Sequence, residues 1–95
     1  MGIGQKMNYV YILIKDKTPV YIGVTSNVSN RISKHKKTKD FDGYLIFYES
    51  ESKQECLLIE RSIIKFHSLY ISEIGVLSNN SKYTNFLYKA TFLNH

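Results

Sequence analysis

The first quarter of the chain has the pattern of two short strands joined by a turn. Residues 9–15 (YVYILIK) are almost all β-branched, aliphatic or aromatic, which is typical of a strand. Residues 20–24 (VYIGV) have the same character, and turn-forming residues separate the two runs. Because proline cannot donate a ladder hydrogen bond, we expect Pro19 in the turn with Asp16. The pattern predicts a β-hairpin.

A first helix is predicted after this hairpin. Ser26 or Asn27 is the expected N-cap, since both residue types accept hydrogen bonds from the free N–H groups at a helix start. Val28 and Ile32 are four positions apart and form the buried pair of a helix that is expected to end near Lys37.

A third strand and a second helix are predicted next. Residues 43–48 (GYLIFY) are apolar and aromatic, as in a strand. Ser52 and Glu55 have the spacing of a capping box, in which each side chain bonds the other residue's backbone N–H. The helix that begins there is expected to run from Lys53 to about Ser68.

The last third of the chain has a weaker pattern. Residues 73–77 are ambiguous, residues 78–82 predict a polar loop, and residues 83–93 fit a helix or a strand. We therefore predict an α/β (α+β) fold: a small three-stranded antiparallel sheet with flanking helices, in the order β-β-α-β-α-(α or β).

Length and composition indicate one globular domain. The chain has 95 residues, of which 43% are hydrophobic and 22% charged, so wholesale disorder is not expected. Residues 1–95 are expected to form one domain, with a core over about residues 8–80 and a C-terminal extension over 81–95. The single Cys56 excludes an internal disulfide and a cysteine-based zinc site, which fits a cytoplasmic protein. No membrane-spanning run and no signal peptide is expected.

Positive charge is concentrated in one segment. The formal net charge is +5, whereas residues 15–39 alone hold seven bases and one acid, a balance of +6. Clustered bases release counterions from a nucleic acid backbone, so the segment predicts contact with phosphate. A solvated helix end explains Lys34 to Lys39 equally well. The candidate nucleic-acid-binding residues are Lys15, Lys17, Gly23, Lys34, Lys36, Lys37 and Lys39.

Tyr11 and Tyr21 lie on either side of the predicted turn. Side chains alternate between the faces of a strand, so these tyrosines share a face only if the loop has an odd number of residues. A three-residue loop would place them opposite each other, and a five-residue loop would offset them by one diagonal step. Gly23 inside the second strand suggests a bulge or a close approach to the backbone. The alternative explanation for both tyrosines is a cross-strand aromatic pair with a purely structural role.

Two further features suggest phosphate or metal chemistry. Arg31 and His35 are four positions apart on one helix face and could hold one phosphate, although an ordinary surface arginine is the plainer interpretation. Glu60 is surrounded in its helix by apolar residues, and a buried carboxylate is costly unless it is paired or binds a metal. An ion pair with Arg31 or another base and the binding of a divalent cation explain the carboxylate equally well. His67 falls on the same helix side and is expected to be a helix-end residue.

Together these residues resemble the GIY-YIG nuclease family, over roughly residues 8–80. Tyr9 and Val10 replace the glycine and isoleucine of the family's first motif, but its tyrosine is kept at Tyr11. The resemblance rests on Tyr9-Val10-Tyr11, Tyr21-Ile22-Gly23, Arg31 with His35, and Glu60 within LLIER.

The resemblance implies a divalent-metal-dependent endonuclease that hydrolyses phosphodiester bonds in DNA by a one-metal mechanism, with RNA not excluded as a substrate. Glu60 would hold one Mg²⁺ or Mn²⁺ ion together with water molecules. A late asparagine is expected near the site, and the choices are Asn79, Asn80 and Asn85.

The other site residues receive roles by the same resemblance. Tyr11 would help to activate the attacking water, and Tyr21 would position water or phosphate. Arg31 would neutralise charge on the phosphoryl oxygens, and His35 would relay a proton or bind phosphate.

Two other functions stay open from the sequence. One is a non-cleaving nucleic-acid-binding module that uses residues 15–39, and the other is an interaction protein whose basic face meets an acidic protein. Because the chain leaves no room for a separate DNA-binding domain, we expect target choice to come from a homodimer, from a protein partner, or from the residues after Ser68.

Overall fold

The fold is an antiparallel sheet with two helices. The computed structural model describes the backbone of residues 6–74 and 91–93, and side chains as far as residue 65 and again over 91–93. The elements are β1 (Asn8–Lys15), β2 (Thr18–Thr25), α1 (Val28–His35), β3 (Gly43–Ser50), α2 (Lys53–Ile74) and β4 (Thr91–Phe92).

The α+β fold expected from the sequence is confirmed, but the number of strands was wrong. The described residues form one four-stranded sheet in the order β2-β1-β3-β4. The additional strand, β4, pairs with Gly43 and Tyr44 at the start of β3. It comes from the segment whose pattern fitted a helix or a strand, and a two-residue strand is too short to give a period.

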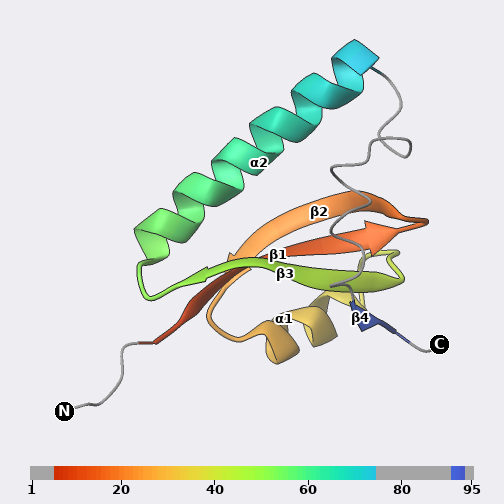
Figure 1. The fold of residues 1–95 in the computed structure, drawn as a ribbon. Helices are drawn as coiled ribbons and strands as arrows, with labels where there is room; N and C mark the ends of the chain where they lie inside the picture. Colours follow the sequence, from red (N-terminus) through yellow and green to blue (C-terminus); the bar gives the residue numbers. More distant parts are fainter. Residues whose placement is uncertain (1–5, 75–90, 94–95) are drawn as a thin grey trace.

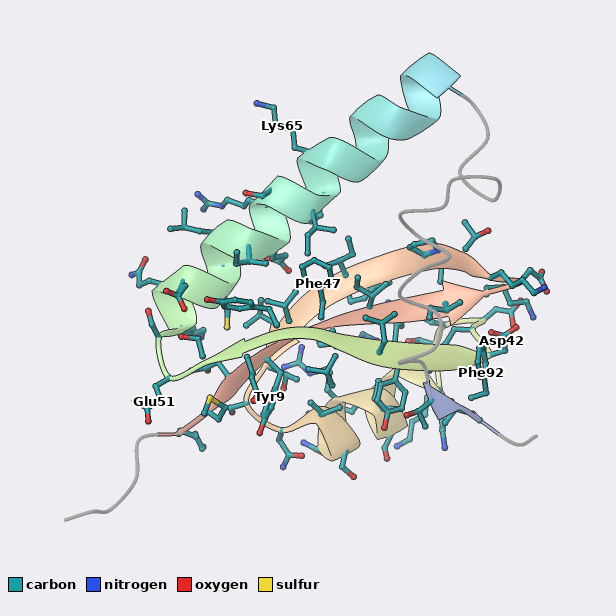
Figure 2. All side chains as sticks on the ribbon, viewed as in Figure 1. Tyr9, Asp42, Phe47, Glu51, Lys65 and Phe92 are labelled. Carbon is teal, nitrogen blue, oxygen red and sulfur yellow. The ribbon has the colours of Figure 1, made fainter. Side chains whose placement is uncertain are left out.

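The two helices cover opposite faces of this sheet (Figure 1). The α1 face buries Tyr11, Leu13, Ile32 and Phe41. The α2 face buries Ile12, Ile14 and Leu45, and Figure 2 shows Phe47 between β3 and α2. Successive side chains of a strand point to opposite faces, so β1 supplies residues to both clusters. The inner strand β1 is therefore buried on both sides, and it positions side chains on the α1 face of the sheet.

The hairpin turn is shorter than the sequence suggested. It contains only Asp16 and Lys17, since Lys15 already pairs with Thr18. Both turn residues have positive φ, 52° and 65°, the combination that a type I′ hairpin turn needs. Pro19 lies in β2 and not in the turn, which corrects our expectation. Proline is tolerated there because β2 is an edge strand and the ladder is irregular next to it.

A bulge at Val20 decides which face Tyr21 occupies. A regular ladder from a two-residue turn would place Tyr21 opposite Ile12, on the face away from Tyr11. The register instead shifts by one residue, so that Tyr21 pairs with Leu13 and lies one diagonal step from Tyr11. The condition that only an odd loop puts the two tyrosines on one face was therefore wrong, because it assumed a regular ladder: the loop is even, and the bulge supplies the odd residue.

The first helix begins at one of its predicted caps. The Asn27 side chain accepts a hydrogen bond from the N–H of Asn30 at 3.0 Å. The helix ends at His35, before the expected end near Lys37. The N–H groups of Thr38 and Lys39 both donate to the His35 carbonyl, at 3.0 and 2.8 Å. The chain therefore turns sharply over the end of α1.

Only half of the predicted capping box forms at the start of α2. Ser52 Oγ accepts from the N–H of Glu55 at 3.1 Å. The Glu55 carboxylate accepts from the Tyr48 hydroxyl at 2.7 Å, and the N–H of Ser52 donates to Ser50 Oγ at 3.0 Å. The second half of the box is lost because each group has a closer alternative partner.

The second helix runs to Ile74, beyond the expected end near Ser68. No helix in the described part of the chain is long and apolar enough to span a membrane. The predicted loop over 78–82 and the candidates Asn79, Asn80 and Asn85 lie outside the described residues, as does the side chain of His67.

We expect Lys17→Gly to stabilise the protein by about 0.5–1 kcal/mol, because glycine adopts positive φ without a steric penalty at Cβ. Lys17→Ala removes the same charge but keeps the Cβ, so it should not be stabilising. Urea denaturation followed by circular dichroism measures both variants. Equal stability of the two would contradict the turn conformation.

Candidate active site

Three aromatic side chains gather on the α1 face of the sheet. Tyr11 comes from β1, Tyr21 from β2, and His35 from the last residue of α1. The ring centroids of Tyr21 and His35 are 4.8 Å apart, those of Tyr11 and His35 5.6 Å, and those of the two tyrosines 6.2 Å. The Tyr11 hydroxyl lies 2.7 Å from Nε2 of His35. We call these three residues the ring cluster.

Gly23 is the reason that Tyr11 fits in this place. The two residues are cross-strand partners, and the ring of Tyr11 lies over the glycine. A Cβ added at residue 23 would be 2.5 Å from the Tyr11 hydroxyl oxygen. The ladder is regular at Gly23, so of the two sequence explanations the close approach applies, and the approaching group is Tyr11.

The buried tyrosine and histidine are both neutral at neutral pH. Burial and the neighbouring Tyr21 raise the pKa of Tyr11 to about 12, although Arg31 acts in the opposite direction. Burial lowers the pKa of His35, and the charges of Lys39 and Arg31 lower it further. Tyr11 therefore keeps its proton beside a neutral imidazole, and it donates to Nε2 in the tautomer that carries the ring proton on Nδ1.

Two cations flank the ring cluster. Arg31 is half-buried on α1 and acts electrostatically on both Tyr11 and His35. The Nζ of Lys39 lies 4.8 Å from the centroid of the Tyr21 ring. No carboxylate is among the described groups that shift the pKa of Tyr11 or His35. The surroundings of the cluster are therefore positive and suit an anion such as phosphate.

The segment after α1 is tied to the hairpin. Lys15 forms an ion pair with Asp40 at 3.2 Å, and the N–H of Asp16 donates to Oδ2 of Asp42 at 3.2 Å. Phe41 between the two aspartates is buried. The remaining candidate lysines are exposed; they are Lys17, Lys34, Lys36 and Lys37, together with Lys39 at the Tyr21 ring.

Glu60 lies apart from the ring cluster. It belongs to α2, on the opposite face of the sheet from α1 (Figure 1). Its side chain is half-buried and not buried as we expected, because its helix side is only partly covered: Cys56 is fully buried, whereas Ile64 is 46% exposed. Glu60 forms no hydrogen bond or ion pair with another described side chain, so the expected alternative of an ion pair with Arg31 is not formed.

Glu60 can supply one ligand to a metal ion. No three His, Cys, Asp or Glu side chains are gathered around a possible metal position in the described parts of the chain. A hard cation such as Mg²⁺ commonly keeps several waters and takes only one or two carboxylates together with substrate oxygens. A half-buried carboxylate without a described partner fits that limited role.

One residue beside the ring cluster was expected only as a nucleic-acid-binding lysine and not as part of the catalytic set. The sequence placed Lys39 only in a general basic segment, because it follows the helix end, where no periodicity fixes the direction of a side chain. The signal that was present is its spacing of four residues from His35.

Comparison with known proteins identifies one family. Residues 7–70, more than half of the chain, match the family model described as the GIY-YIG catalytic domain. The matched region contains both strands of the hairpin, α1, β3 and most of α2. No curated protein matched the chain, and no solved structure matched it.

Gly23→Ala should destabilise the fold by about 1–3 kcal/mol, the usual cost of forcing extra atoms into a packed core. The new methyl group competes with the Tyr11 hydroxyl for the same space. In a Tyr11→Leu background the ring is absent, and the same change should cost clearly less. A double-mutant cycle by urea denaturation measures the difference. Additive effects would show that Tyr11 does not occupy the space over Gly23.

An NMR titration of His35 should give a pKa below the ordinary value of 6.5. With this lower pKa in the folded state, the unfolded state binds the proton more readily than the folded state. The stability contributed by neutral His35 is therefore complete above about pH 6.5, and it is lost as the pH falls through the folded-state pKa. His35→Gln should reduce this acid-side loss. A His35 pKa at or above the ordinary value would contradict the buried neutral imidazole.

Proposed function

This chain belongs to the GIY-YIG family of nucleases, which act on nucleic acids and generally use divalent metal ions, and we propose that it is a DNA endonuclease that uses Mg²⁺ or Mn²⁺. The observation that carries the proposal is the bond between the Tyr11 hydroxyl and His35 Nε2 inside the ring cluster, with Arg31 beside it. An acceptor for a proton and a cation for a phosphate are two of the groups that assist phosphodiester hydrolysis.

The two tyrosines have different tasks because their exposure differs. Tyr11 is completely buried, whereas Tyr21 is half-buried. Tyr21 is therefore the tyrosine that meets the attacking water, and its hydroxyl also acts on that of Tyr11. As the water oxygen bonds to phosphorus, the bond from phosphorus to the leaving oxygen breaks, and that oxygen takes a proton from solvent. One proton of the attacking water passes to Tyr21, Tyr21 gives its own proton to Tyr11, and Tyr11 gives its own to Nε2 of His35.

Arg31 holds the phosphate during this step. Its guanidinium carries a permanent charge and a fork of donors that matches two phosphoryl oxygens. The negative charge on these oxygens increases in the transition state, so a cation that is already in place favours the transition state over the bound substrate. Half-burial of Arg31 strengthens the effect because less water screens it.

Glu60 is the residue that we propose as the protein ligand of the metal ion, with water and substrate oxygens as its other ligands. Such an ion would supply Lewis-acid polarisation of the scissile phosphate and stabilisation of the leaving oxygen. Asn79 or Asn80 is proposed as a further site residue by resemblance alone.

A non-cleaving nucleic-acid-binding module is the second candidate. The observation that favours it is the separation of Glu60, on α2, from the ring cluster on the other face of the sheet. The exposed lysines of residues 15–39 serve either function, since they attract the backbone without regard to sequence.

Plasmid DNA incubated with Mg²⁺ or Mn²⁺ tests the proposal. Cleavage is expected for the native chain, and Glu60→Gln should lower its rate at least about 100-fold, since loss of a metal ligand is more serious than the 10–100-fold loss of an outer partner. Glu51→Gln removes the same charge from an exposed position in the turn before α2 (Figure 2) and should cleave normally.

Circular dichroism checks that both variants are folded. Normal cleavage by Glu60→Gln would exclude Glu60 as the metal ligand. Salt-sensitive DNA binding by the native chain, with no cleavage under either metal, would establish the binding module instead.

A further inference from the structure

Lys39 is held in the ring cluster by its backbone as well as by its side chain. Its N–H donates to the His35 carbonyl at 2.8 Å, and its Nζ lies 4.8 Å from the centroid of the Tyr21 ring. Two residues further on, Phe41 is buried, and the N–H of Asp42 donates to the carbonyl of Ile14 at 2.8 Å. The short segment is anchored at both ends, so the position of Lys39 is not that of a free surface lysine.

The contact with a ring distinguishes Lys39 from the other basic residues. Among the described lysines, it is the one whose ammonium group lies over an aromatic ring. Lys15 is occupied by its ion pair with Asp40. A cation over a tyrosine ring gains about 0.5–1 kcal/mol at an exposed site, enough to favour one direction of a long side chain.

Arg31 and Lys39 act on different tyrosines of the ring cluster. Arg31 acts on Tyr11, whereas Lys39 lies at Tyr21, and both act on His35 between them. The two cations keep the imidazole neutral, and no described carboxylate acts on it, so the positive charge around the cluster is available to an anion. A phosphodiester carries one negative charge shared by two free oxygens, one for each cation.

We propose that Lys39 is a further active-site residue, whose ammonium group is the second cation that contacts the phosphate at Tyr21. This inference rests on the proposed function, which identifies the anion as a phosphate of the nucleic acid. It gives Lys39 a task that the exposed lysines Lys34, Lys36 and Lys37 do not have, because they attract the polyanion as a whole.

Kinetics on DNA separates these two tasks. Lys39→Gln should lower kcat about tenfold, less than the 10²–10³-fold cost of losing a fully preorganised donor, because Lys39 is exposed. Lys39→Arg keeps the charge and the ring contact and should recover most of the rate. Lys36→Gln should act mainly through KM and salt dependence. Lys65→Gln, on the side of α2 turned away from the sheet (Figure 2), is the matched control and should behave as the native chain.

A second measurement does not depend on cleavage. Inorganic phosphate added to the metal-free protein should shift the ring NMR signals of Tyr21 and His35, and Lys39→Gln should weaken that binding several-fold while Lys65→Gln does not. The same spectra show that each variant is folded.

The two measurements also separate this inference from the proposed function. Lys39-dependent shifts without any cleavage would keep the phosphate contact and reject the nuclease. Cleavage whose kcat is as high in Lys39→Gln as in Lys65→Gln, with unchanged phosphate shifts, would reject the role of Lys39 and leave the nuclease intact.

Discussion

The hydrogen bond between buried Tyr11 and His35 is the interaction on which the site depends. It joins the central strand to the end of α1, and it requires a glycine at residue 23 to leave room for the phenol ring. Burial makes both groups harder to ionise, so the bond is made between neutral partners at physiological pH. Fixing α1 in this way also fixes Arg31 one turn earlier in the helix. The positions of β1, Gly23 and the end of α1 therefore all have to be in place before the polar groups of the site can act together.

Much of the fold follows from local patterns in the sequence. The hairpin, the Asn27 cap, the third strand and the start of α2 at Ser52 were predictable, since each depends on residues that are close in the chain. Tyr11, Tyr21, Arg31 and His35 were chosen from motif spacing, and the structure brings them together. The bulge at Val20 was not predictable, because it reflects a compromise between a tight turn and the burial of both faces of β1. The place of Pro19 in β2 follows from the same compromise.

The outcome for Glu60 shows the limit of helical periodicity. The pattern correctly indicates that apolar neighbours surround the carboxylate along the helix, but it does not say how much of that helix side another element covers. Ile64 is largely exposed only four residues beyond Glu60, so the surroundings of the carboxylate are partly open to water. The pattern also does not say which sheet face a helix takes. Here α1 and α2 lie on opposite faces, so the position of Glu60 relative to the ring cluster depends on how the two helices pack on the sheet.

The register of the hairpin limits how this domain can change in length. The face occupied by Tyr21 depends on whether the number of residues between the paired positions of the two strands is odd or even, and one unpaired residue at Val20 makes it odd in total. An insertion or deletion of a single residue between Tyr11 and Tyr21 would turn the second tyrosine to the α2 face, whatever residue was involved. Two such changes would cancel. Related chains with the same ring cluster should therefore differ by even numbers of residues between the two tyrosines. A chain whose hairpin loop has an odd number of residues should have a regular ladder without a bulge.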